Sequence, residues 1–246
     1  MIVVGRRLLR SAFTAVVRWR VWRDLGGVWV RGLADVEGLR SRGPVLFAAN
    51  HVCWWDAMLL PLLDAPLGGR GRVLMDAANL ARLPYFGALG ALRLDSSDLA
   101  TVRAGLRSAV TVLDGPGDSL WIFPQGRQVP VHRRPLGLRR GVHHIARSSG
   151  APAVPVSLYY GWGQGPRPVA LVEFGPPLVA GTRSAFMAEL EARLVAGLDA
   201  AEAALAVGPA QCGYAPLVHG RQSSPETGLG SRLLQVLWPD AGGPHA

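Results

Sequence analysis

The sequence predicts an α/β fold in which helices flank a central mixed sheet, with an amphipathic helical segment at the N-terminus. Short apolar runs alternate with stretches of helical periodicity, which is typical of layered α/β proteins. Glycine, proline and other turn-forming residues lie beside these runs, as expected at the ends of strands. The chain has 246 residues, 49% of them hydrophobic, so it is long and apolar enough to bury the core of one large domain.

The apolar runs and the periodic stretches define the expected elements in order. Strands are expected at residues 45–49, 72–75, 91–94, 120–123, 153–158 and 169–174. Helices are expected at residues 56–63, 98–113, 141–148 and 184–206. These elements assign one domain to residues 31–207. From residue 208 the composition shifts toward Gly, Pro, Ser and Gln, so residues 208–246 are expected to be a loosely ordered tail in which only 229–238 can pack.

Residues 1–30 are expected to form a basic amphipathic segment that associates with a membrane. At about 100° per residue, one broad face of a helix would carry Leu8, Leu9, Ala12, Val16 and Trp19. Most arginines of the segment lie roughly opposite, although Phe13 and Val17 interrupt that polar side. Arginine and tryptophan together suit the membrane interface, and the alternative is a surface helix packed on its own domain. No run of about 18 uncharged apolar residues occurs, so no membrane span is expected.

The chain is strongly basic, with a formal net charge of +9 that comes entirely from arginine, because the sequence has no lysine. This excess reflects either biased codon usage or an acidic partner, which would be a phosphate, a nucleic acid or an anionic membrane. Two cysteines exclude a disulfide framework, and no Cys/His cluster has the spacing of zinc ligands. No metal site is therefore expected.

A polar run, Asn-His-Val-Cys-Trp-Trp-Asp, occupies residues 50–56, between an expected strand and an expected helix. Five residues of a regular helix turn through about 500°, so His51 and Asp56 can meet only if His51 lies in the turn before the helix. Asp56 would then fix the tautomer of the imidazole, and the other ring nitrogen could take a proton from a hydroxyl. The alternative is a core histidine that is satisfied by a nearby acid.

A second polar segment follows the expected strand at 120–123. Gly126 permits a tight turn there, and Arg127 can offer a planar guanidinium to a phosphate or a carboxylate. Arg139 and Arg140 open an expected helix, whose N-terminus favours anions. Because open α/β sheets bind ligands at the carboxyl ends of their strands, this segment is expected to line a ligand crevice. The alternative is a solvated run of charge.

Taken in order, these segments resemble motifs of the glycerolipid acyltransferase family, whose members acylate glycerol phosphate and lysophosphatidic acid. Residues 50–56 resemble its motif Asn-His-x-Ser-x-x-Asp, with Cys53 in place of serine. Phe-Pro-Gln-Gly-Arg at 123–127 resembles Phe-Pro-Glu-Gly-Thr-Arg, with Gln125 in place of glutamate and the threonine missing.

Three further segments extend this resemblance over residues 30–176. Residues 90–95, a glycine followed by alternating apolar residues and an acid, resemble a second motif, but Ser96 stands where an arginine is usual. Arg-Arg-Gly at 139–141 and Val-Pro-Val at 154–156 resemble the remaining conserved features of the family.

The resemblance implies an O-acyltransferase of the 1-acylglycerol-3-phosphate type that needs no cofactor. His51, oriented by Asp56, would be the general base on an acceptor hydroxyl, which would then attack an acyl thioester of coenzyme A or acyl carrier protein. Substrate binding would fall to Gln125, Gly126, Arg127, Arg139 and Arg140, while Cys53 would be structural. The implied partners are a lipid acceptor, the acyl donor and a membrane surface, and the implied location is the cytoplasmic side of a membrane, with peripheral or monotopic attachment.

The departures from the family motifs leave other functions open. A non-phosphate lipid hydroxyl, such as that of a glycolipid or a carotenoid glycoside, is an alternative acceptor, because Ser96 and Gln125 remove charges that the family usually has. A catalytically inactive membrane-bound scaffold of the same fold is a second alternative. A hydrolase is disfavoured, because no Gly-x-Ser-x-Gly motif occurs. A nucleic-acid binder is disfavoured, because no groove-reading module is present.

Overall fold

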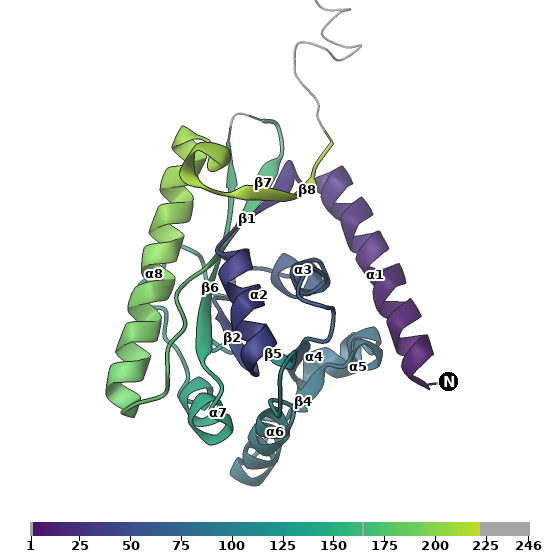
Figure 1. The fold of residues 1–246 in the computed structure, drawn as a ribbon, viewed down its shortest axis with the longest axis vertical. Coiled ribbons are helices and arrows are strands. Elements are labelled where there is room, and N and C mark those ends of the chain that lie inside the picture. The colour runs from purple at the N-terminus through teal and green to yellow at the C-terminus, as the bar shows by residue number, and fades with distance from the viewer. Residues whose placement is uncertain (1, 164, 222–246) are drawn as a thin grey trace, which may run out of the picture.

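The computed structural model describes residues 2–163 and 165–221, and within these residues one mixed sheet forms the centre of the molecule (Figure 1). Its strands lie in the order β4-β3-β5-β2-β6-β7-β1-β8. Their bounds are β1 Gly27–Arg31, β2 Val45–Ala49, β3 Arg72–Asp76, β4 Leu92–Leu94, β5 Ser119–Ile122, β6 Ala153–Trp162, β7 Pro168–Phe174 and β8 Ala215–His219. The first five strands in that order run parallel, whereas β7 is antiparallel to β6 and β8 is antiparallel to β1. The predicted central mixed sheet is therefore confirmed.

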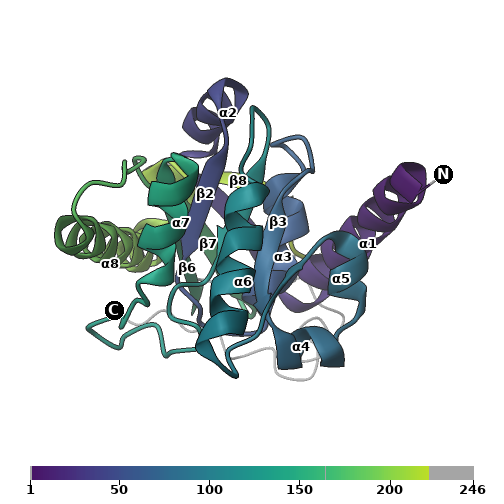
Figure 2. The ribbon, with the colours of Figure 1, turned by 90° about the horizontal axis from the view of Figure 1, so that it is seen from below.

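Helices cover both faces of the sheet, with α8 and α1 on opposite sides (Figure 1). The helices are α1 Ile2–Asp24, α2 Leu33–Arg42, α3 Trp55–Asp64, α4 Ala77–Arg82, α5 Tyr85–Leu89, α6 Leu99–Thr111, α7 Gly141–Ser149 and α8 Arg183–Val207. Seen from below, α6 and α7 lie side by side over the sheet (Figure 2). This layering follows from the two apolar faces of the central strands.

The position of β2 in the middle of the sheet explains why its sequence is an unbroken apolar run. All five of its residues are buried, because helices cover both of its faces. Phe47 packs in the core that α1 and α3 cover, and it stacks on Trp121 of β5 at 4.3 Å between ring centroids. Leu46 and Ala48 point to the other face, into the core of α6, α7 and α8. Such a strand is held in one register, which fixes where its carboxyl end lies.

Several elements differ from the sequence expectation, and the short helices α4 and α5 are among those that it did not include. The last residues of the expected membrane segment form β1, which pairs with β7 and β8 inside the sheet, and an unexpected helix α2 follows it. Residues 215–219, expected in a loose tail, form β8. A short 3-10 helix, Pro209–Cys212, leads into β8. Part of the expected tail, including residues 229–238, lies outside the described residues.

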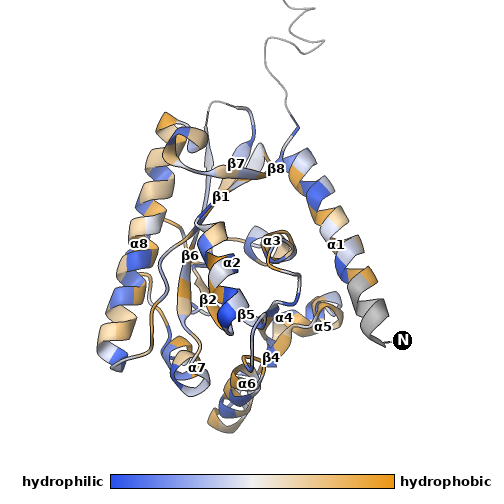
Figure 3. Ribbon diagram, viewed as in Figure 1, coloured by the Kyte–Doolittle hydropathy of each residue, from blue (hydrophilic) through white to orange (hydrophobic). Residues whose placement is uncertain are grey.

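Helix α1 is present, but it buries a different face from the one that its sequence pattern emphasises. Val17 and Val21 are fully buried against the domain, on the side that was expected to be polar. Arg10 also points into the domain, where its guanidinium donates to the carbonyls of Gly69, Gly71 and Leu89. Figure 3 shows polar and apolar residues interleaved along the described part of this helix. Across the described residues, no helix is long and apolar enough to cross a membrane.

Candidate active site

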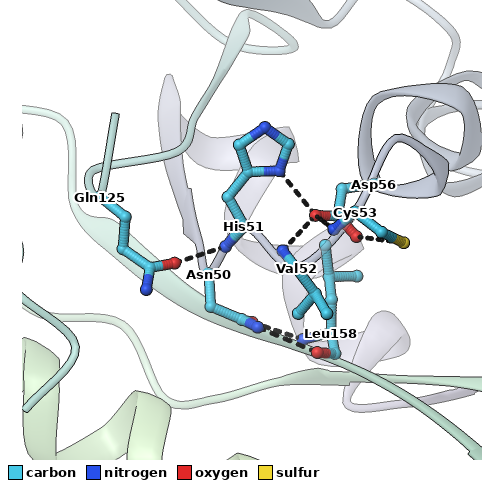
Figure 4. A network of polar contacts seen from close by, with 7 residues as sticks. All are labelled: Asn50, His51, Val52, Cys53, Asp56, Gln125 and Leu158. Atoms are coloured by element: carbon cyan, nitrogen blue, oxygen red, sulfur yellow. Dashed lines mark hydrogen bonds and ion pairs between the residues drawn. The ribbon is translucent and has the colours of Figure 1, made fainter. Parts of the chain in front are cut away.

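The structure brings His51 and Asp56 into direct contact at the carboxyl end of β2. Nδ1 of His51 lies 2.6 Å from Oδ2 of Asp56, a short distance for a hydrogen bond to a carboxylate (Figure 4). His51 lies in the turn after the strand, and Asp56 lies in the first turn of α3. This is the arrangement in which five residues of separation allow the two side chains to meet.

Asp56 is completely buried, and its local role explains how the turn forms. Besides the imidazole, its Oδ2 accepts hydrogen bonds from the backbone N–H groups of Val52, at 2.5 Å, and Cys53, at 3.0 Å. These two amides belong to the turn that precedes α3, which begins at Trp55. One carboxylate therefore holds this turn and orients the histidine.

The imidazole of His51 is fixed from two sides but remains open to a ligand. Its ring stacks on Phe123 at 4.5 Å between centroids, and Phe123 follows β5, the strand beside β2. Its side chain keeps 20% of its surface exposed. The other ring nitrogen points away from Asp56 (Figure 4), so it can accept a proton from a bound hydroxyl.

Two buried amide side chains hold this turn in place. Asn50 donates to the carbonyl of Leu158 and accepts from the N–H of the same residue, which ties the end of β2 to β6. Gln125 accepts from the N–H of His51 at 2.6 Å and donates to the carbonyl of Leu136. Both amides thus hydrogen-bond to backbone groups where β2 has ended at Ala49.

This geometry gives Gln125 a different role from the one expected of it. Its side chain is 5% exposed, and its hydrogen bonds go to backbone groups of the site, so the structure shows it supporting the turn of His51. The hydrogen bond to Leu136 also explains why a glutamine can stand where the family motif has a glutamate. A glutamine can donate to the carbonyl of Leu136, whereas a carboxylate there would meet another acceptor.

Three of the predicted binding residues form an exposed basic rim on the loop after β5. Arg127, Arg139 and Arg140 are exposed, and within the described part of the chain their side chains make no hydrogen bond or ion pair. Gly126 has φ of 67°, and a Cβ there would meet the Arg139 guanidinium at 2.7 Å, so the glycine lets that side chain cross the turn. Arg140 directly precedes α7, whose N-terminal amides favour anions. The rim is a place where an anionic group can bind.

Cys53 lies beside the catalytic candidates His51 and Asp56, the dyad of this site, but is unsuited to nucleophilic catalysis. Burial, followed by the nearby charge of Asp56, raises the pKa of its thiol to about 11. The thiolate is the reactive form of cysteine, so the group is inert near neutral pH. Among the described residues, no cluster of three or more His, Cys, Asp or Glu side chains is arranged to hold a metal ion.

Sequence reasoning missed several residues that shape the site. Phe123 was expected as the end of a strand and as the first residue of a motif, and Asn50 as part of a motif, but neither was assigned a role in the site. Trp54 stacks on Trp55 at 4.6 Å, and the guanidinium of Arg20 in α1 lies over the Trp54 ring at 5.4 Å. An aromatic pair at the start of α3 was visible in the sequence, but its contact with α1 depends on tertiary structure.

The fold and the site define a class: an α/β protein with a carboxylate-oriented histidine and a basic rim at the carboxyl edge of a largely parallel sheet. A family model described as "Acyltransferase" matches residues 32–159, which is more than half of the chain. The chain therefore belongs to the acyltransferase family, and the resemblance found in its motifs is confirmed.

Individual relatives are more distant. The chain is 28% identical over 169 residues to the 1-acyl-sn-glycerol-3-phosphate acyltransferases of Limnanthes alba and Limnanthes douglasii. The match covers 63% of this chain, and it spans only 58% of the length of those curated relatives. The crystal structure of the 1-acyl-sn-glycerophosphate (LPA) acyltransferase PlsC from Thermotoga maritima is similar with a TM-score of 0.55 and 18% identity, over 79% of this chain and 78% of that one. At this identity the similarity to PlsC shows the fold alone.

Proposed function

We propose that this protein transfers a fatty acyl chain from an acyl thioester to a hydroxyl of a lysophosphatidic-acid-like lipid. The observation that carries the proposal is the 2.6 Å contact of His51 with buried Asp56, in a turn where the His51 side chain keeps 20% of its surface exposed. The acyl donor is acyl-coenzyme A or acyl-acyl carrier protein. No cofactor enters the reaction.

The proposed reaction needs one proton carrier. The free ring nitrogen of His51 takes the proton of the acceptor hydroxyl as its oxygen attacks the thioester carbonyl. Asp56 holds the imidazole in the tautomer that can accept this proton, and it stabilises the imidazolium that forms. The carbon–sulfur bond then breaks, the ester remains, and the imidazolium returns its proton to the leaving thiolate.

The basic rim supports a phosphate-bearing substrate. Arg127, Arg139 and Arg140 are exposed cations beside the loop that carries Phe123, the ring on which His51 stacks. Guanidinium groups bind phosphate through paired hydrogen bonds. Arg139→Ala is expected to raise KM for a phosphate acceptor at least about tenfold while changing kcat little. Arg147→Ala is the matched control, since Arg147 is an exposed arginine in the last turn of α7.

We also propose that α1 holds the enzyme at the cytoplasmic surface of a membrane, without spanning it. Its exposed side carries large apolar side chains that keep 46–67% of their surface exposed: Leu8, Val16, Trp19 and Trp22. Aromatic and aliphatic side chains next to arginines suit the lipid interface. Both the acceptor lipid and the product would be held there.

The decisive experiment is an acceptor screen with a labelled acyl thioester on the purified protein and its variants. His51→Ala and Asp56→Asn are expected to lower acyl transfer at least about a hundredfold, because each removes the proton acceptor or its orientation. Circular dichroism checks that both variants remain folded. Full activity of either folded variant would overturn the proposed mechanism.

The screen also separates the remaining candidates. Transfer to a lysophosphatidic acid with none to a glycolipid or a carotenoid glycoside supports the proposed acceptor. The reverse result would replace it with a non-phosphate hydroxyl. An absence of transfer to every acceptor would indicate a scaffold, and release of free fatty acid without an acceptor would indicate a hydrolase.

A further inference from the structure

We propose that Tyr160 and Cys53 are positioning residues that together hold Oδ1 of Asp56, the carboxylate oxygen that does not face His51. This inference rests on the proposed role of His51 and Asp56 in acyl transfer. It adds a residue of β6 to the groups that hold the dyad in position.

The two oxygens of Asp56 are used unequally. Oδ2 accepts three hydrogen bonds, from the imidazole and from two backbone amides. Among the described residues, Oδ1 receives only the thiol of Cys53, at 3.9 Å (Figure 4), and the carboxylate has no exposure to solvent. An oxygen of a buried charge that lacks a donor is costly, because water cannot replace the missing partner.

Tyr160 carries a buried hydroxyl on the face of the sheet that α3 covers. Its oxygen is enclosed, yet among the described residues it makes no hydrogen bond of normal length and angle. The side chains of Asp56 and Cys53 lie close to it, and burial together with the charge of Asp56 raises the pKa of Tyr160 far above its usual value. The phenol thus keeps its proton and can act as a donor toward the carboxylate.

The topology of the sheet explains why Tyr160 reaches this position. Asn50 pins the end of β2 to Leu158 of β6 through two hydrogen bonds. Tyr160 lies two residues further along β6 and so points to the same face of the sheet as Leu158, the face that α3 covers. Tyr159 points to the opposite face, where it packs in the cores that α8 lines.

Cys53 makes the second donor necessary. A thiol donates a weaker and longer hydrogen bond than a hydroxyl does, and its Sγ remains 3.9 Å from Oδ1. Where the resembling motif has a serine, a hydroxyl could approach the carboxylate more closely. In this chain the phenol of Tyr160 is the stronger of the two donors that we assign to Oδ1.

The test is a set of variants at residues 53 and 160, assayed for kcat and KM with the acceptor found in the screen. Tyr160→Phe is expected to lower kcat about tenfold with KM within about twofold, because the dyad is misaligned while the binding surface is intact. Adding Cys53→Ser to Tyr160→Phe is expected to restore kcat to within about threefold of wild type, because serine brings a hydroxyl to Oδ1. Adding Cys53→Ala instead should restore nothing.

Tyr159→Phe is the matched control, because it removes the same hydroxyl from the neighbouring residue on the far face of β6; it should leave kcat unchanged. Wild-type kcat in Tyr160→Phe, or equal kcat for Tyr160→Phe with and without Cys53→Ser, would overturn the inference. If Tyr160→Phe does not fold, the single variants at residue 53 decide. Cys53→Ala is then expected to lower kcat, whereas Cys53→Ser is expected to leave kcat unchanged. Equal kcat for these two variants would overturn the inference. His51→Ala in the same assay tests the proposed function separately. Full activity of His51→Ala would overturn the proposed function, whatever the kcat of the variants at residue 160.

Discussion

At the scale of single residues, the site depends on buried polar side chains that hydrogen-bond to other parts of the protein. Asp56 joins the start of α3 to the imidazole, Asn50 joins β2 to β6, and Gln125 joins the loop after β5 to the turn of His51. Because these groups are buried, removing one leaves its partners without hydrogen bonds. Substitutions here are therefore expected to act on geometry before they act on substrate binding.

Gln125→Ala tests the role that its contacts assign. We expect kcat to fall about tenfold with KM for the phosphate acceptor nearly unchanged, because the side chain holds the backbone of His51 and does not face a ligand. Steady-state kinetics measures both constants. Gln128→Ala is the control, since Gln128 is an exposed glutamine of the same loop. An increase in KM alone would return Gln125 to the substrate-binding surface.

The thiol of Cys53 is expected to resist alkylation. Its pKa of about 11 lies above the usual value of 9.0, so at pH 8 the folded protein keeps it protonated, and it gains reactivity only as the pH approaches 11. Mass spectrometry after iodoacetamide treatment should find Cys53 modified at least about tenfold more slowly in folded than in urea-unfolded protein. Equal rates in the two states would contradict the buried environment.

At the scale of elements, the parallel strands β5 and β2 bring two distant motifs to one edge. Their carboxyl ends are neighbours, so His51 after β2 and Phe123 after β5 stack on each other although they are far apart in the chain. Two further elements lie away from this edge: α1 packs on the core beside α3, and β8 pairs with β1. The exposed side of α1 and the pairing of β8 can each be tested by substitution.

The exposed side of α1 is expected to determine membrane binding. Replacing Leu8, Val16 and Trp19 together by serine should weaken binding to anionic vesicles at least about tenfold, because these side chains contribute apolar area at the interface. The matched control replaces Leu99, Val179 and Trp162, which are the same residue types, also exposed, and lie outside α1. Equal sedimentation of the two triple variants would contradict the assignment. Deletion of residues 1–28 would be a poorer test, because it would also cut β1.

Strand β8 is expected to contribute to global stability. Val218→Asp should lower the free energy of unfolding by about 2 kcal/mol or more, because it buries a charge without a partner. Thermal unfolding measures the effect as a lower Tm. Ala215→Asp places the same charge at an exposed position of the same strand and should change Tm little. Equal Tm values for the two variants would show that residues 215–219 do not pack on β1.

At the scale of the whole molecule, the excess of arginine favours anionic surfaces. A net charge of +9 is expected to make vesicle binding depend on both lipid charge and salt. Raising NaCl from about 0.05 to about 0.5 M should weaken binding to anionic vesicles at least about tenfold, because the Debye length shrinks, and should change binding to neutral vesicles little. Binding to DNA with none to anionic vesicles would contradict a membrane partner.

The sequence by itself determined the layered α/β class, the approximate places of most strands, and the pairing of His51 with Asp56. These features depend on local information: the period of apolar residues, and a spacing of five residues that a strand-to-helix turn brings together. The family motifs added the expected chemistry of the site through resemblance, and the family itself is confirmed by the match over residues 32–159.

Only the tertiary structure decided which face of α1 is buried and that residues 27–31 and 215–219 are strands. It also decided that Gln125 holds the backbone of His51. Each of these facts depends on partners that are distant in the chain: Val17 meets the domain core, β8 pairs with β1, and Gln125 contacts the backbone of His51. A sequence pattern reports the polarity and spacing of side chains. It does not report which distant backbone group satisfies a buried amide, because that is fixed only when the chain has packed.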